Sequence, residues 1–147
     1  MRQPLALPAL GLMLLGSAAL LRAQSTALSA QDVWIRAMPA SDVAAAYLTL
    51  HNQGQETLVV VAVRSPVAQQ AMIHESRIVE GRSTMRPRAT VPVAPGKTVR
   101  FAPGGLHIML TGLKRKLTPG EDVPLLLELQ GGASLAVSAH VRALGSD

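Results

Sequence analysis

Turn-forming residues recur at intervals of roughly ten residues along most of this chain and divide it into short apolar or alternating runs. Gly, Pro and Asn supply the fixed or positive φ values that tight turns require. Turns at this spacing leave no room for long helices and are typical of an antiparallel β-sandwich or barrel. The predicted strands are Asp32 to Met38, Ala44 to Asn52, Thr57 to Arg64, Gln70 to Ile78, Ser83 to Arg86, Thr98 to Phe101, Leu106 to Thr111, Val123 to Leu129 and Ser134 to Arg142.

One alanine run favours helix by propensity alone, at Ala44 to Ala46. The residues that follow, Tyr47 to Leu50, are strand formers. We therefore predict a strand whose small residues lie where another element approaches closely. A short helical turn between Asp42 and Ala46, or at Leu113 to Leu117, would leave the all-β class unchanged.

The first 23 residues have the composition of an export signal. Arg2 precedes an apolar stretch from Leu5 to Leu21, and small residues follow it. A proline and a glycine interrupt this stretch, which is short for a transmembrane helix of about 20 apolar residues. We expect cleavage after Ala23, or as late as Ala30, and a periplasmic mature protein without a membrane span. A retained anchor is the alternative, because Arg22 is unusual so close to a cleavage site.

The remaining chain, residues 31–143, fits a single domain with one buried core. Without Arg2 and Arg22, 12 basic residues stand against 9 acidic residues, which leaves a net charge of +3. This charge is small, and the three aromatic residues provide no stacking platform, so we expect no nucleic-acid partner. The chain has no cysteine, so it can form no disulfide and offers no thiol for lipid attachment.

Two histidines and two methionines form the pattern H-x10-M-x21-H-x-M, at His74, Met85, His107 and Met109. Alternate residues of a strand share one face, so His107 and Met109 project together while their neighbours project into a core. A hairpin turning near Gly81 would bring Met85 beside His74. The spacing does not establish whether this hairpin lies next to the strand of His107.

The chemistry of this residue set favours monovalent copper. Thioether sulfur is a soft ligand that suits Cu(I), and imidazole accepts several first-row metals. The set has no carboxylate, which argues against Mg, Ca and Mn, and zinc would lose the ligands that it prefers. A blue-copper electron-transfer site needs a cysteine thiolate, which this chain lacks.

The pattern resembles that of the periplasmic copper chaperones of the PCu(A)C family. The likeness covers the chain from about Asp32 to Val141. Its most similar segments are Ala45 to Leu50, Ser65 to Ala68, Met85 to Pro87, Pro103 to Leu110 and Gly112 to Lys114.

The resemblance implies a cupredoxin-like Greek-key β-sandwich with a solvent-near Cu(I) site. Carried over residue by residue, it implies that His74, Met85, His107 and Met109 are the copper ligands. It further implies delivery of copper towards the binuclear copper centre of a haem-copper oxidase, often with a thiol-containing assembly partner. Ser76 stands where many members carry another methionine, and the chain lacks the His- and Met-rich tail with which some bind Cu(II). We therefore expect no second copper site.

These observations predict a monomeric, non-enzymatic Cu(I) carrier that passes copper to an oxidase subunit or a thiol-containing assembly factor. No nucleophile with a paired base, acid pair or phosphate loop is recognisable in the sequence. One alternative is a storage or resistance protein that sequesters Cu(I) at the same residues. Another is a plain interaction module with incidental His and Met, which would bind no Cu(I).

Several residues near or outside the pattern receive weaker assignments. Met72 shares the predicted face of His74 and is expected to pack in the core or at a rim, and the alternative is that it shields or supplements the site. His51 and His140 fall outside the pattern, and Trp34 is expected to anchor the core or its rim. The segment from Glu75 to Arg88 is basic, and we interpret it either as a solvated loop or as a collar that steers an acidic receptor.

Overall fold

A computed structural model describes residues 27–146 of the chain. The predicted export signal, residues 1–23, lies outside the described residues. Within them the chain forms strands and turns and no helix, so the described part has no helix long and apolar enough to cross a membrane. Neither of the short helical turns that we allowed for is present, and Ala44 to Ala46 lie in a strand, as predicted.

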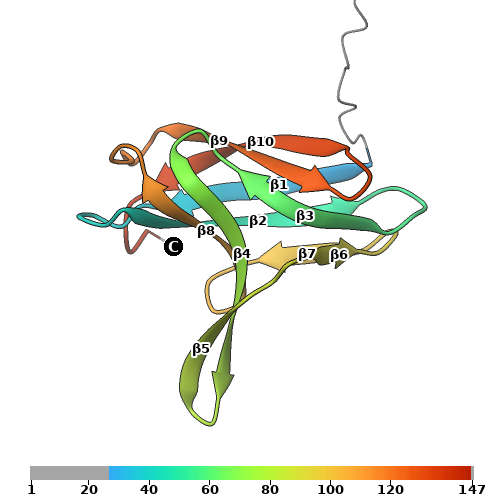
Figure 1. Ribbon diagram of the computed structural model, residues 1–147, viewed down its shortest axis with the longest axis horizontal. Coiled ribbons are helices and arrows are strands. Elements are labelled where there is room, and N and C mark those ends of the chain that lie inside the picture. Colours follow the sequence, from blue (N-terminus) through green and yellow to red (C-terminus); the bar gives the residue numbers. More distant parts are fainter. Residues whose placement is uncertain (1–26, 147) are drawn as a thin grey trace, which may run out of the picture.

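The described residues form one ten-stranded sheet that folds over on itself around a core (Figure 1). The strands are β1 (Leu28–Arg36), β2 (Val43–Asn52), β3 (Leu58–Arg64), β4 (Ala68–Val79), β5 (Arg82–Pro87), β6 (Val91–Val93), β7 (Thr98–Phe101), β8 (Leu106–Leu113), β9 (Asp122–Leu129) and β10 (Ser134–Arg142). Their order is β5-β4-β8-β7-β2-β1-β10-β9-β3-β6, and β8 also pairs with β2. All nine predicted strands are present, and neighbours distant in sequence, such as β4 and β8, are typical of Greek-key connections.

The sequence did not predict β6, which has only three residues. Pro92 stands in its middle and cannot donate to a neighbouring strand, so proline is tolerated only where one side is unpaired. That condition is met, because β6 lies at one end of the sheet and pairs only with β3. Val91 and Val93, on either side of the proline, are buried in the core.

Alternation along the central strands builds this core. Ile108 and Leu110 of β8 are fully buried against the other layer, and so are Ala44 and Ala46 of β2. The alanines of β2 pair directly with β8, Ala44 with Leu110 and Ala46 with Ile108. His107 and Met109, which alternate with Ile108 and Leu110 along β8, are thereby turned to the outer face.

A single buried amide connects the end of β2 to the rest of the fold. The Nδ2 of Asn52 donates to the carbonyls of Glu56 (2.7 Å) and Val93 (2.8 Å), and its Oδ1 accepts from the Gly54 amide at 2.9 Å. Because Asn52 is 0% exposed, water cannot replace these bonds.

We expect Asn52→Ala to lower the free energy of unfolding by about 2–4 kcal/mol, because the buried Val93 carbonyl would lose its donor. Urea denaturation would measure the change as a lower midpoint with an unchanged slope. The neighbouring exposed Gln53→Ala is the control and should unfold like the original protein. A loss of less than about 0.5 kcal/mol for Asn52→Ala would contradict this role.

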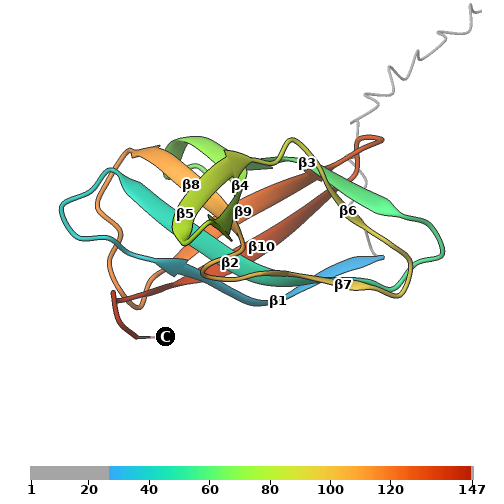
Figure 2. The ribbon, with the colours of Figure 1, turned by 90° about the horizontal axis from the view of Figure 1, so that it is seen from below.

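The hairpin of β4 and β5 stands out from the body of the molecule (Figure 1). Its turn consists of Glu80 (φ 50°) and Gly81 (φ 73°), between the paired residues Val79 and Arg82. Two consecutive positive φ values define the type I′ turn that suits two-residue hairpins. Figure 2 looks onto the molecule from the side to which this hairpin projects.

Candidate metal centre

Strand register brings the four predicted ligands to one face of the β5-β4-β8 part of the sheet. His74 of β4 lies directly opposite His107 of β8, two positions from the facing pair Met72 and Met109. On the other side of β4, Ser76 lies opposite Met85 of β5. Directly opposed residues share a face, and so do alternate residues of one strand. The face therefore carries two imidazoles and three thioethers.

These side chains differ in exposure in a way that gives the site a closed and an open side. His107 is buried, with 5% of its surface exposed, and its ring lies edge-on to that of His74, with 5.8 Å between the centroids. Met109 is half-buried. Met85 and Met72 are 51% and 41% exposed and form the outer rim. A metal ion bound between the imidazoles would thus be approached from solvent past the thioethers.

The surroundings of His107 fix its ring. Its Nδ1 lies 3.1 Å from the Gly105 carbonyl oxygen, which can only accept, so Nδ1 carries the proton. The same carbonyl accepts from the Ser76 amide at 3.0 Å, which holds the loop against β4. Nε2 of His107 is consequently the nitrogen with a free lone pair, an arrangement typical of metal-binding histidines.

His74 is prepared for a ligand in a different way. Its Nδ1 is buried and has no hydrogen-bond partner among the described residues. Burial, followed by repulsion from His107, lowers the pKa of His74 below its ordinary value. The ring is therefore neutral at neutral pH, which is the form that binds a metal.

The composition of this face discriminates between metals. In the described part of the chain, no three His, Cys, Asp or Glu side chains gather closely enough to hold a metal ion. The nearest acid along β4, Glu75, points to the opposite face. A face of imidazole and thioether without carboxylate suits Cu(I) and disfavours harder cations.

The basic segment proves to be neither a loop nor a collar around the site. It forms the β4–β5 hairpin, and its arginines alternate with the site residues, so they project from the back of the hairpin. There Glu75 pairs with Arg77 at 3.0 Å and Arg88 at 2.9 Å, and the hydrogen bond from Arg77 is the main cause of the lowered pKa of Glu75. The site face of the hairpin is uncharged.

The other two histidines lie away from the site and have their own partners. His51 Nδ1 lies 3.0 Å from Thr98 Oγ1, and His140 Nδ1 lies 3.0 Å from Asp122 Oδ1. Sequence analysis did not predict that the ring of Trp34 packs against that of Tyr47, tilted by 37° and with 4.6 Å between the centroids. Spacing could not reveal this contact, because the two residues meet only through the pairing of β1 with β2.

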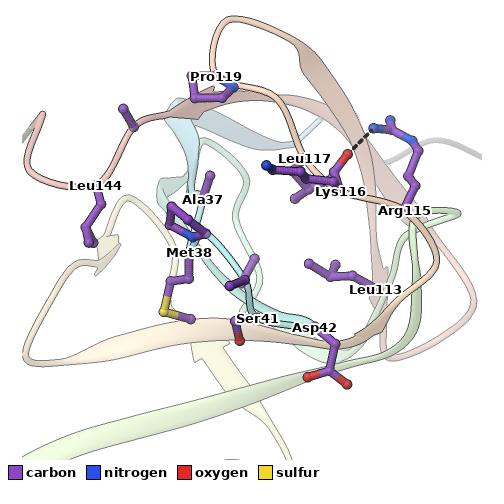
Figure 3. A pocket seen from close by; sticks show the side chains of 14 residues that line it. Ala37, Met38, Ser41, Asp42, Leu113, Arg115, Lys116, Leu117, Pro119 and Leu144 are labelled. Atoms are coloured by element: carbon purple, nitrogen blue, oxygen red, sulfur yellow. Dashed lines mark hydrogen bonds between the residues drawn. The ribbon is translucent and has the colours of Figure 1, made fainter.

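A cavity of about 600 Å³ lies at the other end of β8 (Figure 3). It is lined mainly by apolar residues of the β1–β2 and β8–β9 connections and the C-terminal segment, among them Met38, Leu113, Leu117 and Leu144. None of the predicted ligands lines it. This cavity is therefore separate from the candidate metal centre.

Comparison with known families and proteins adds two sequence similarities. The family described as "Putative lipoprotein LpqE-like" matches residues 28–141. The protein called "Putative lipoprotein Lxx21020", from Leifsonia xyli subsp. xyli (strain CTCB07), is 31% identical over 120 residues, which cover 81% of this chain and 72% of that protein.

Solved structures confirm the predicted all-β, cupredoxin-like fold. The copper-bound PCuAC domain from PmoF2 aligns with a TM-score of 0.67 at 19% identity, over 80% of this chain and 93% of that one. The solution structure of CuI-DR1885 from Deinococcus radiodurans aligns with a TM-score of 0.57 at 31% identity, over 87% and 83% of the two chains. These neighbours are a PCuAC domain with copper and a protein with Cu(I).

Proposed function

The chain belongs to the LpqE-like family, and we propose that it is an exported Cu(I) carrier of the PCu(A)C type. The proposed ligands are His74, Met85, His107 and Met109. The observation that carries this proposal is the direct opposition of His74 and His107 on a face with exposed thioethers. Similarity to CuI-DR1885 supports the choice of metal.

The unequal exposure of the ligands accounts for holding and release. Copper would be anchored by the imidazoles, of which that of His107 is buried and fixed by Gly105. Met85 lies on the projecting hairpin and is half exposed, so an incoming ligand can replace its thioether first. Transfer would then proceed by ligand exchange without any bond being made or broken in the protein chain.

The proposed destination is the binuclear copper centre of a haem-copper oxidase in the periplasm, reached directly or through a thiol-containing assembly factor. The protein would act as a monomer and not as an enzyme. The alternative, sequestration of excess Cu(I), uses the same site. Loss of oxidase activity under copper limitation would support delivery, whereas sensitivity only at copper excess would support sequestration.

We expect Met109→Leu to weaken Cu(I) binding by about tenfold or more with little effect on folding, because leucine keeps the volume and removes the sulfur. Titration against a competing Cu(I) chelator would measure the affinity. Met38→Leu is the matched control, since Met38 lines the distant cavity and should leave the affinity unchanged. Equal affinity of Met109→Leu and the original protein would refute this ligand.

A further inference from the structure

The face of the candidate metal centre continues beyond Met109 across the sheet. Paired residues form one row over five strands, in the order Arg142, Arg36, Ala45, Met109 and Met72. Directly paired residues lie on the same face, so the two arginines share the outer face with the thioethers. Ala45, between Arg36 and Met109 in this row, is only 9% exposed, so larger neighbouring side chains cover it.

The arginine end of this row is organised by aromatic rings. The guanidinium carbon of Arg142 lies 4.7 Å from the ring centroid of Trp34, and that of Arg36 lies 5.5 Å from Trp34 and 5.6 Å from Tyr47. Stacking on Trp34 holds the guanidinium of Arg142 flat and leaves its N–H edges available for a carboxylate. Arg142 pairs with no carboxylate of the described residues, because Asp122 of the adjacent strand bonds to His140.

The two ends of the row fit under one protein partner. Neighbouring strands lie about 4.8 Å apart, which places Arg142 roughly 14 Å from Met109 along the row. An ordinary interface covers about 800 Å² of each partner, or roughly 30 Å across. The hairpin end of the same face offers the exposed, uncharged side chains of Met72, Ile78 and Met85.

We propose that this face is the docking surface for an acidic Cu(I) acceptor, with a carboxylate of the acceptor bound to Arg142 beside Trp34 and its metal ligands placed over Met72 and Met85. The assignment rests on the proposed function. The charge at one end and the uncharged methionine rim at the other orient the partner, because its carboxylate is attracted to Arg142 and its soft metal ligands then lie over the thioethers.

Two synthetic peptides of equal length test the surface. Each carries the same pair of cysteines as Cu(I) acceptor, flanked in one by glutamates and in the other by glutamines. Trp34 is the single tryptophan of the chain, so its fluorescence in the copper-free protein reports docking. We expect saturable binding of the glutamate peptide at low salt, and a loss of about fivefold or more in Arg142→Gln.

Arg64→Gln is the matched control, because Arg64 of β3 makes a surface ion pair with Glu128 at 2.8 Å and lies outside the row. It removes the same charge and should bind the glutamate peptide like the original protein. Equal losses in both variants, or no fluorescence response to the glutamate peptide, would overturn the docking surface.

Copper transfer separates this inference from the function on which it rests. Cu(I)-loaded protein should pass copper faster to the glutamate peptide than to the glutamine peptide, and Arg142→Gln should abolish that advantage without changing Cu(I) affinity. If the original protein binds no Cu(I), the proposed function fails, while the titration of the copper-free protein still decides the docking surface. If Cu(I) binds and Arg142→Gln retains the full rate advantage, the docking surface alone is refuted.

Discussion

Replacing His107 by phenylalanine is expected to lower the affinity for Cu(I) by at least about a hundredfold while the protein still folds. Removing a side chain that only supports a metal ligand already lowers metal affinity by about ten- to a hundredfold. His107 is itself a proposed ligand, and it is buried. Phenylalanine fills the space of the imidazole, and the Gly105 carbonyl keeps the Ser76 amide as donor. Competition with a Cu(I) chelator would measure the affinity, and urea denaturation would confirm the fold.

His140→Phe is the corresponding control. His140 lies on an exposed strand position, bonded to Asp122, and takes no part in the proposed site. Its replacement should leave Cu(I) affinity unchanged. A His107→Phe protein that folds normally and binds Cu(I) as well as the His140→Phe protein would remove His107 from the ligand set.

Acidification is expected to release copper steeply, because a proton and Cu(I) compete for each imidazole while the thioethers do not titrate. Affinity for Cu(I) should fall by up to about tenfold per pH unit for each imidazole that must lose a proton before it can bind the metal. Burial and the neighbouring His107 lower the pKa of His74. Protons therefore begin to compete with Cu(I) for His74 at a lower pH than they would for an ordinary histidine. Chelator competition at several pH values between neutrality and about pH 4.5 would give the slope.

A variant that lacks one of the two histidines tests this explanation. His74→Met keeps a soft ligand at this position, so the pH slope should fall to that of one histidine. An unchanged slope in His74→Met would exclude His74 as the competing group. The folding stability of the copper-free protein should also fall on acidification, because the folded state disfavours protonated His74. The stability due to neutral His74 is fully present above the ordinary pKa of histidine and is lost as the pH falls through the lowered pKa of His74.

Most strands could be predicted because a half-buried strand shows its pattern locally. The errors occur where that pattern is interrupted. β1 begins at Leu28, four residues before the predicted start, because the register shifts between Gln31 and Trp34 and Asp32 adopts a positive φ of 49°. β6 was missed because its central proline is acceptable only at a sheet edge, and edge position follows from the order of all strands.

Part of the candidate site could likewise be predicted from local pattern, and part could not. Alternation along one strand was sufficient to place His107 beside Met109, and the glycine of a two-residue turn was sufficient to return Met85 towards β4. That His74 faces His107 could not be predicted from spacing, because it depends on which strand pairs with β4. The arginines of the hairpin were misjudged although both strands were predicted, because the alternation that turns Arg77, Arg82 and Arg86 away from the site residues was not applied to them.

The sequence by itself determined the all-β class, the turns, the types of available ligand and the absence of thiols, because each of these follows from residues near one another in the chain. Only the tertiary structure decided that β4 lies between β5 and β8, which side of the site is open, and that Arg142 shares its face. Strand order is set by the burial of all apolar faces together, and no single segment contains that information.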